Sequence, residues 1–120
     1  MTQDSPVFTP VIAASDFPDD GKLARKIGGW HVLVAQVDGA FHAFNDRCPH
    51  AAAMLSGGRV RRGAVMCPLH GARFDLTNGA CLGGAYPALR SFPCRVTDGQ
   101  IEVAVPDAAP GMEDLPIVPR

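Results

Sequence analysis

Apolar residues along this chain gather in short runs separated by glycine-containing turns. Two Asp-Gly pairs, Asp38-Gly39 and Asp98-Gly99, each stand between two such runs. Both residues of an Asp-Gly pair accept positive φ angles, which the two-residue turns of β-hairpins require. The sequence therefore predicts two hairpins, with strands at 30–37 and 40–45 in the first and at 94–97 and 100–105 in the second.

The last of these strands shows the clearest two-residue period. Ile101, Val103 and Val105 alternate with more polar or smaller residues, so one face of the strand is expected to be buried. Many short strands without a long helix predict an all-β fold of antiparallel sheets, a β-sandwich or barrel. Further short strands are expected at 7–13, 23–27, 64–66 and 73–76, with Asn78-Gly79 as another turn.

Helix signals are weak, and the C-terminal end lacks any period. The single helix candidate is 14–20, where Ser15 could cap one turn and Pro18 limits its length. Residues 106–120 contain four prolines, so we expect a Pro-rich tail that is loosely packed or disordered. The chain is thus divided into one domain over residues 1–105 and this tail.

Composition supports one small globular domain. The chain has 120 residues, of which 47% are apolar and 19% are charged, a balance too apolar for a disordered protein. The formal net charge is 11 − 12 = −1, which predicts no binding of nucleic acid or of an anionic membrane. The opening MTQDSPVF has no basic segment of the kind found in secretory signals, so we expect a cytoplasmic protein.

The chemistry of the chain is concentrated in two short cysteine and histidine segments. Cys48-Pro49-His50 is followed by sixteen residues and then by Cys67-Pro68-Leu69-His70. In an extended segment, the two ligands of a C-x-H motif leave the same side of the backbone. Each cysteine is followed by proline, which fixes φ and lowers the entropy lost when a loop orders around a metal.

Two interpretations of these segments need to be weighed from the residues alone. The cysteines could be ordinary core residues beside surface histidines, because unpaired cysteine is among the most buried residue types. A mononuclear zinc site is the second, since Cys₂His₂ is an accepted tetrahedral set. Zinc motifs usually pair cysteine with cysteine and histidine with histidine, whereas each segment here mixes the two.

The spacing C-P-H, sixteen residues, C-P-L-H resembles the signature of Rieske-type 2Fe-2S proteins. The segments DRCPH and CPLHGARFD are similar to those of Rieske ferredoxins in particular. The resemblance extends to the hairpin VAQVDGAFHAFNDRCPH and to LTNGACLGGAYPAL, and it covers roughly residues 7–105. It implies a Rieske-type fold in which a cluster-binding subdomain occupies about residues 45–87.

The resemblance also implies the cofactor and its ligands. One 2Fe-2S cluster would be held by Cys48 and Cys67 on one iron and by His50 and His70 on the other. The segment 83–87 would be a third loop that shields the cluster. Replacing two thiolates by neutral imidazoles makes the cluster easier to reduce than a four-cysteine cluster.

The function that the resemblance implies is one-electron transfer. The protein would be a monomeric carrier, not itself an enzyme, between a flavin-dependent NAD(P)H reductase and a terminal oxygenase of the ring-hydroxylating type. Two alternatives stay open from the sequence. One is a small Rieske subunit of a multi-subunit oxidoreductase such as an assimilatory nitrite reductase, and the other is a zinc-stabilised interaction module.

Four positions depart from the high-potential members of this family. Those members carry a disulfide between the two cluster loops and hydroxyl donors just after the second loop. Because the matching positions here lack both, we expect a reduction potential near the lower end of the Rieske range of about −150 to +300 mV. The four residues are Ala53, Leu69, Ala72 and Phe74.

Charge is unevenly distributed around the motif. Residues 45–75 contain five arginines and two aspartates, a local balance of +3. This segment could steer an acidic partner to the cluster, or its arginines could form a solvated turn opposite the cluster. Ordinary structural roles are expected elsewhere, with Trp30 as a core anchor, His31 and His42 as strand residues, and Cys81 and Cys94 at small core positions.

Overall fold

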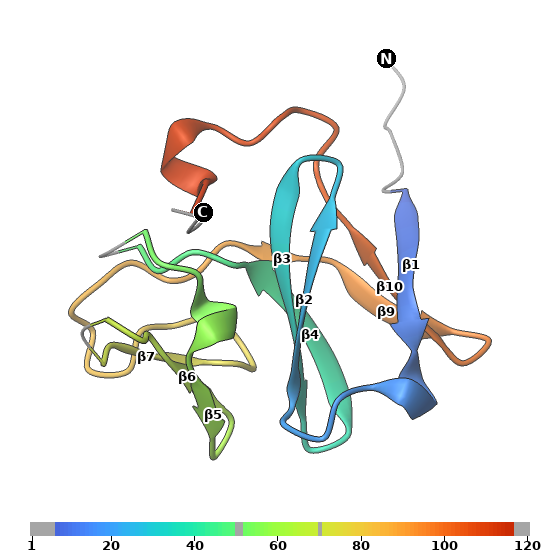
Figure 1. Cartoon of the computed structure of the whole chain (residues 1–120), viewed down its shortest axis with the longest axis horizontal. Coiled ribbons are helices and arrows are strands. Elements are labelled where there is room, and N and C mark those ends of the chain that lie inside the picture. Colours follow the sequence, from blue (N-terminus) through green and yellow to red (C-terminus); the bar gives the residue numbers. More distant parts are fainter. Residues whose placement is uncertain (1–6, 50–51, 70, 117–120) are drawn as a thin grey trace.

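The computed structural model describes residues 7–49, 52–69 and 71–116, and these form three antiparallel sheets (Figure 1). The first sheet has the order β1-β10-β9, with β1 at Phe8–Ala13, β9 at Cys94–Thr97 and β10 at Gln100–Ala104. The second has the order β2-β3-β4-β8, with β2 at Lys22–Ile27, β3 at Trp30–Val37, β4 at Ala40–Asn45 and β8 at Ser91–Phe92. The third contains β5 at Arg59–Arg61, β6 at Ala64–Met66 and β7 at Arg73–Asp75.

Both predicted hairpins are confirmed. Strands β3 and β4 pair antiparallel from Val37 and Ala40 outward, and β9 and β10 pair around the second Asp-Gly turn. The turn residues have positive φ angles, 51° and 82° at Asp38 and Gly39 and 50° and 79° at Asp98 and Gly99. These values are typical of the type I′ turn, whose twist matches that of the strands it joins.

Strand β3 divides the interior into two cores because it is buried on both faces. Val32 and Val34 face one core, which the β1-β10-β9 sheet closes with Ile101 and Val103. Leu33 and Ala35 face the other core, which the β5-β6-β7 sheet covers. Burial on both faces explains the near-continuous apolar run WHVLVAQV of β3. A strand with one face toward solvent would alternate apolar and polar residues. The middle sheet thus separates the core closed by the β1-β10-β9 sheet from the core that contains Cys48 and Cys67.

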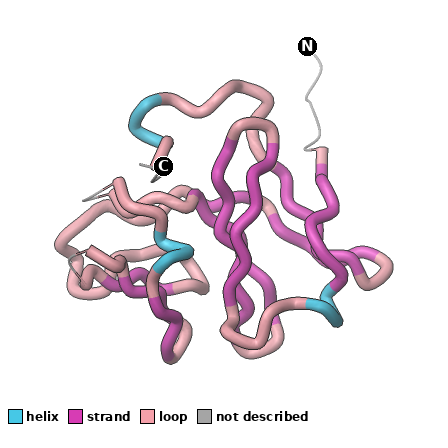
Figure 2. Tube along the Cα trace, viewed as in Figure 1, coloured by secondary structure: helices cyan, strands magenta, loops and turns pink. Residues whose placement is uncertain are grey.

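Some local predictions were wrong or incomplete. The helix expected over 14–20 is only a single 3₁₀ turn at Ala14–Asp16, and Ser15 does not cap it. Strands β5 and β8 were not predicted. The three helical turns of the described chain are 3₁₀ turns, at 14–16, 55–57 and 112–114 (Figure 2), and no helix there is long and apolar enough to cross a membrane.

The C-terminal segment is attached to the domain over residues 106–116, so the expectation of loose packing is wrong there. The Trp30 indole donates to the carbonyl of Ala108 at 3.1 Å, and the Asn45 side-chain amide donates to that of Asp114 at 2.9 Å. The Arg47 guanidinium donates to the carbonyl of Leu115 at 3.0 Å. The segment therefore passes the start of β3 and the end of β4 and approaches the first cysteine loop (Figure 1). Residues 117–120 of the expected tail lie outside the described residues.

Candidate metal centre

The two cysteines of the motif lie in one core, whereas the two histidines cannot be placed. Cys48 follows β4 and Cys67 follows β6, with exposed fractions of 0% and 1%. Both belong to the core cluster between the middle sheet and the β5-β6-β7 sheet, and neither forms a disulfide. His50 and His70 lie outside the described residues, so their position as ligands stays a prediction.

The loops that carry the cysteines close with the same hydrogen-bond pattern. In each, the cysteine amide donates to the carbonyl five residues later, at 2.8 Å from Cys48 to Ala53 and at 2.7 Å from Cys67 to Ala72. The cysteine carbonyl accepts the amide four residues later, from Ala52 at 2.9 Å and from Gly71 at 3.1 Å. The chain after each cysteine therefore returns to that cysteine within five residues, and the expected extended conformation up to His50 lies outside the described residues. Two matched turns present two buried thiols, although the C-x-H and C-x-x-H spacings differ.

This arrangement fits a metal centre that takes one thiolate from each loop. A thiolate buried away from water is costly unless a cation stabilises its negative charge. A centre bound by Cys48 and Cys67 supplies that cation and joins loops that are nineteen positions apart in the sequence. In the sequence, a histidine follows each cysteine after one or two residues, so the donor set suits an iron–sulfur cluster with mixed ligands.

The two loops carry different residue types at one equivalent position, four residues after the cysteine. Ala52 has a φ of 56°, and its counterpart in the second loop is Gly71 with a φ of 76°. Alanine in the left-handed region carries a steric cost of roughly 1 kcal/mol or more that glycine avoids. The first loop therefore contains a strained alanine at the position where the second loop has glycine.

Exchanging these two residue types should change stability in opposite directions. We expect Ala52→Gly to raise the free energy of unfolding by about 0.5–1 kcal/mol and Gly71→Ala to lower it by about 1 kcal/mol. A Cβ at Gly71 would meet no atom within 4 Å, so strain is the main effect there. Denaturant unfolding of both variants measures this, and shifts of the same sign would contradict the loop equivalence.

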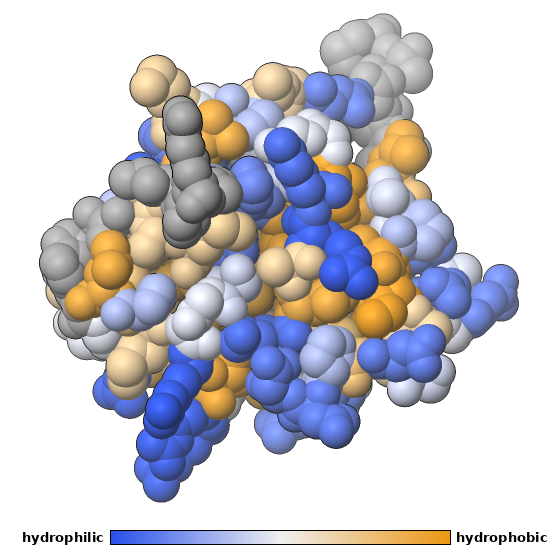
Figure 3. All heavy atoms as spheres, in the orientation of Figure 1, coloured by the Kyte–Doolittle hydropathy of each residue, from blue (hydrophilic) through white to orange (hydrophobic). Residues whose placement is uncertain are grey.

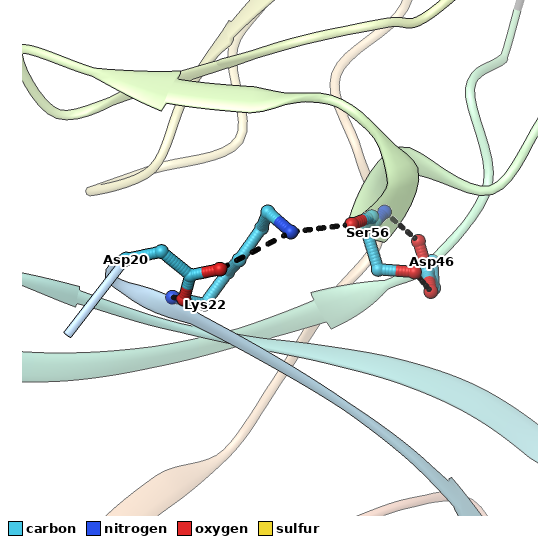
Figure 4. A network of polar contacts seen from close by, with 4 residues as sticks. All are labelled: Asp20, Lys22, Asp46 and Ser56. Carbon is cyan, nitrogen blue, oxygen red and sulfur yellow. Dashed lines mark hydrogen bonds and ion pairs between the residues drawn. The ribbon is translucent and has the colours of Figure 1, made fainter. Parts of the chain in front are cut away.

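A buried carboxylate, which no sequence pattern indicated, ties the first cysteine loop to its surroundings. Asp46 is fully buried and accepts two hydrogen bonds from Ser56, from its amide at 2.7 Å and from its hydroxyl at 2.6 Å. Lys22 of β2 donates to the carbonyl of Ser56 at 2.7 Å and pairs with Asp20 at 3.6 Å (Figure 4). The two ends of the loop that contains Cys48 are thereby held together and fixed to the middle sheet.

Removing the Ser56 hydroxyl tests this tie. We expect Ser56→Ala to lower the free energy of unfolding by about 1–3 kcal/mol, because one oxygen of a buried carboxylate then loses its partner. Ser15→Ala is the control, since Ser15 is exposed and forms no capping bond. Equal unfolding midpoints for the two variants in urea would show that the Asp46–Ser56 bond contributes nothing.

The other aromatic, histidine and cysteine residues considered in the sequence lie in strands or pack against the cores. Trp30 is 2% exposed and is confirmed as a core residue, and His31 and His42 lie on β3 and β4. Cys81 and Cys94 are only partly buried and pack against different cores, which excludes a bond between them. Burial raises the pKa of the Cys94 thiol. Cys81 therefore packs against the core that contains Cys48 and Cys67, whereas Cys94 packs against the other core.

The expected third loop begins beside the second cysteine loop. Cys81 forms an isolated bridge with Phe74 of β7, and the amide of Leu82 donates to the carbonyl of Arg73 at 2.8 Å. The glycines of this loop have φ angles of 92° at Gly83 and 72° at Gly84, so the chain turns sharply there. The loop is therefore anchored to the strand that follows Cys67.

Comparison with known proteins points to one family. The model of the Rieske [2Fe-2S] domain matches residues 7–101. The anthranilate 1,2-dioxygenase ferredoxin subunit of Burkholderia cepacia is 38% identical over 98 residues, which cover 80% of this chain and 90% of the relative. Residues 102–120 lie beyond the family match.

Two solved structures have closely similar folds. One is a chain in the complex of reduced oxygenase and oxidised ferredoxin in carbazole 1,9a-dioxygenase, with a TM-score of 0.75, 28% identity, and coverage of 83% of this chain and 94% of that one. The other is a putative NADH-dependent nitrite reductase small subunit from Mycobacterium tuberculosis, with a TM-score of 0.74, 28% identity, and coverage of 85% and 97%. Both similarities confirm the all-β architecture of antiparallel sheets.

Proposed function

Because this chain belongs to the Rieske [2Fe-2S] domain family, we propose that it is a monomeric cytoplasmic one-electron carrier from a flavin-dependent NAD(P)H reductase to a terminal oxygenase of the ring-hydroxylating type. The observation that carries the proposal is the pair of matched loops with Cys48 and Cys67 buried in one core. The relative in a dioxygenase system is a ferredoxin subunit, which supports an electron-transfer role without catalysis.

The proposed ligands of the single Rieske-type cluster are Cys48 and Cys67 on one iron and His50 and His70 on the other. When bound, the cluster takes up and releases one electron at a time. The side chains of Cys48 and Cys67 are buried from water, and segment 83–87 is proposed to shield the cluster. Family membership sets aside the zinc-stabilised module considered above.

Residues near the cysteines are proposed to keep the reduction potential low. Phe74 is fully buried in the core cluster that contains both cysteines, and Ala72 packs against it. Neither side chain can donate a hydrogen bond, so the extra negative charge of the reduced form receives no stabilisation from them.

Adding a donor at either position should raise the midpoint potential. A net hydrogen bond of about 0.5–1.5 kcal/mol corresponds to about 20–65 mV for one electron. We expect a rise of that size in Phe74→Tyr or Ala72→Ser, measured by potentiometric titration. Phe92→Tyr, in the other core, should leave the midpoint unchanged. An unchanged midpoint in both test variants would refute the hydrogen-bond account.

One structural similarity favours a second candidate function. The nitrite reductase small subunit matches almost as well as the chain from the oxygenase–ferredoxin complex, with TM-scores of 0.74 and 0.75. On that alternative, the protein would be a fixed subunit within a larger oxidoreductase. A fixed subunit co-purifies with its large partner, whereas a free carrier elutes alone at the size of one chain.

Reconstituted electron transfer tests the proposed function. The purified red-brown protein is mixed with NADH and a flavin-dependent reductase encoded in the same genome, and then with a Rieske-type terminal oxygenase from that genome. We expect one electron to be taken up per chain and passed to the oxygenase in rapid-mixing absorbance traces. A protein that neither accepts electrons from a reductase nor reduces an oxygenase would contradict the proposal.

A further inference from the structure

One face of the β5-β6-β7 sheet places arginines around exposed apolar side chains. The strand register aligns Arg59, Met66 and Arg73 directly across the sheet, and Leu82 follows because its amide bonds to the carbonyl of Arg73. Met66 and Leu82 are 40% and 41% exposed. These side chains line a hollow of about 280 Å³, and the arginine face is defined as Arg59, Arg61, Arg62 and Arg73 with Met66 and Leu82.

Among the described residues, the positive charges of this face have no ion-pair partner. In the described chain, Arg90 pairs with Asp114 and Arg95 pairs with Glu102, but no ion pair involves an arginine of the arginine face. Asp75 lies two residues after Arg73 on β7. Its carboxylate accepts hydrogen bonds from the amide of Thr77 at 2.8 Å and from the hydroxyl of Thr77 at 2.6 Å. Four like charges around one hollow repel one another, so an external negative group is attracted there.

The arginine face adjoins the second cysteine loop. A second hollow of about 300 Å³ is lined by Arg59 and Met66, which it shares with the first, and also by Cys67 and Gly71. The turn with Arg62 lies at the far end of the β5-β6 hairpin, and in Figure 3 strongly hydrophilic atoms project at the lower left, where Figure 1 shows that hairpin. The face therefore extends from a distal solvated turn to the backbone of a proposed ligand.

We propose that the arginine face is the docking surface for an acidic protein partner that carries an apolar residue at the centre of its patch. This inference rests on the proposed carrier function and adds where the redox partner binds and what chemistry recognises it. Arginine and methionine are enriched in protein interfaces, and the exposed Met66 and Leu82 supply the apolar centre that a small anion would not need. Residues 45–75 carry a formal charge of +3, and the whole chain has a net charge of −1, so the rest of the chain carries −1 − 3 = −4. This separation of charge orients the molecule so that the arginine face meets an acidic surface.

Charge reversal on the arginine face tests the proposal. The variant is Arg59→Glu with Arg73→Glu, and the control is Arg25→Glu with Lys26→Glu on β2, which carries the same change of net charge away from both hollows. All four side chains are exposed, so both variants should keep fold and cluster absorbance. The reduced proteins are mixed with hexacyanoferrate(III) and, separately, with the oxygenase used above. Each reduced chain gives up one electron and is oxidised, and hexacyanoferrate(III) is reduced to hexacyanoferrate(II).

We expect the arginine-face variant to react about fivefold or more slowly than wild type with both oxidants at low ionic strength, with a weaker salt dependence. The β2 control should stay within about twofold of wild type. Equal oxygenase rates for the two variants would overturn the docking surface. A slowed reaction with hexacyanoferrate(III) alone would also overturn it, because the face would then attract small anions only. A wild-type protein that fails to reduce the oxygenase at any ionic strength overturns the proposed function itself, and this inference with it.

Discussion

Replacing Gly58 by alanine is expected to lower the free energy of unfolding by about 3 kcal/mol or more and to prevent cluster retention. A Cβ at this position would overlap the carbonyl oxygen of Met66 and lie 3.2 Å from that of Leu55. Both obstacles are backbone atoms, so no side-chain rotation relieves the clash. Met66 immediately precedes Cys67, and a displaced β6 therefore moves the second cysteine loop.

The neighbouring glycine provides the control for this prediction. Gly57 has a negative φ, and a Cβ there would meet only the Pro68 ring at 4.0 Å, an ordinary contact. Gly57→Ala should therefore unfold within about 0.5 kcal/mol of wild type in urea and retain its iron. If Gly58→Ala matched Gly57→Ala in both stability and iron content, the close packing of β5 on β6 would be wrong.

Substituting either motif cysteine should abolish cluster binding. In Cys48→Ser or Cys67→Ser the weaker hydroxyl ligand replaces a thiolate, so we expect iron and acid-labile sulfide to fall to near zero and the visible absorption to disappear. Cys94→Ser is the control, because Cys94 packs in the other core, and it should retain two irons per chain.

Because both motif cysteines are buried, loss of iron could also follow from misfolding. Far-ultraviolet circular dichroism separates the two causes, since the middle sheet and the β1-β10-β9 sheet form a core of their own. Cys48→Ala and Cys67→Ala extend the test with an apolar replacement suited to the buried site. A serine or alanine variant with wild-type iron and sulfide would exclude that cysteine as a ligand.

The hairpins were predictable because their determinants are local. The two Asp-Gly turns specify the loop type, and the apolar runs beside them specify the strands. Strand β5 was missed because Arg59–Arg61 has one apolar residue and its turn uses Arg62 at a φ of 52°, where asparagine, aspartate or glycine is usual. Strand β8 has two residues, which is too short for any period.

Features that depend on distant residues escaped prediction. The C-terminal segment lacks a pattern of its own, and its order comes from bonds to Trp30, Asn45 and Arg47, which lie 68 to 78 positions away in the sequence. The tie between Asp46 and Ser56 likewise joins separate elements. Sequence patterns report local periods and turn chemistry, so they carry little information on such contacts.

The candidate site was predictable in its chemistry more than in its geometry. The spacing of cysteine, proline and histidine identified the ligands that we propose, and burial of Cys48 and Cys67 in one core agrees with it. The equivalence of the two loops was hidden because one motif has one residue between cysteine and histidine and the other has two. The arginine face depends on strand register, which the sequence did not supply for the β5-β6-β7 sheet.

The most direct test of the central claim is pulsed electron paramagnetic resonance of the dithionite-reduced protein labelled with ¹⁵N-histidine. Ligation by two cysteines and two histidines predicts one unpaired electron per chain that couples to two imidazole nitrogens, and both couplings should persist in His31→Gln and His42→Gln. A reduced protein without a paramagnetic signal, or with a signal that lacks histidine nitrogen coupling, would contradict the mixed-ligand cluster.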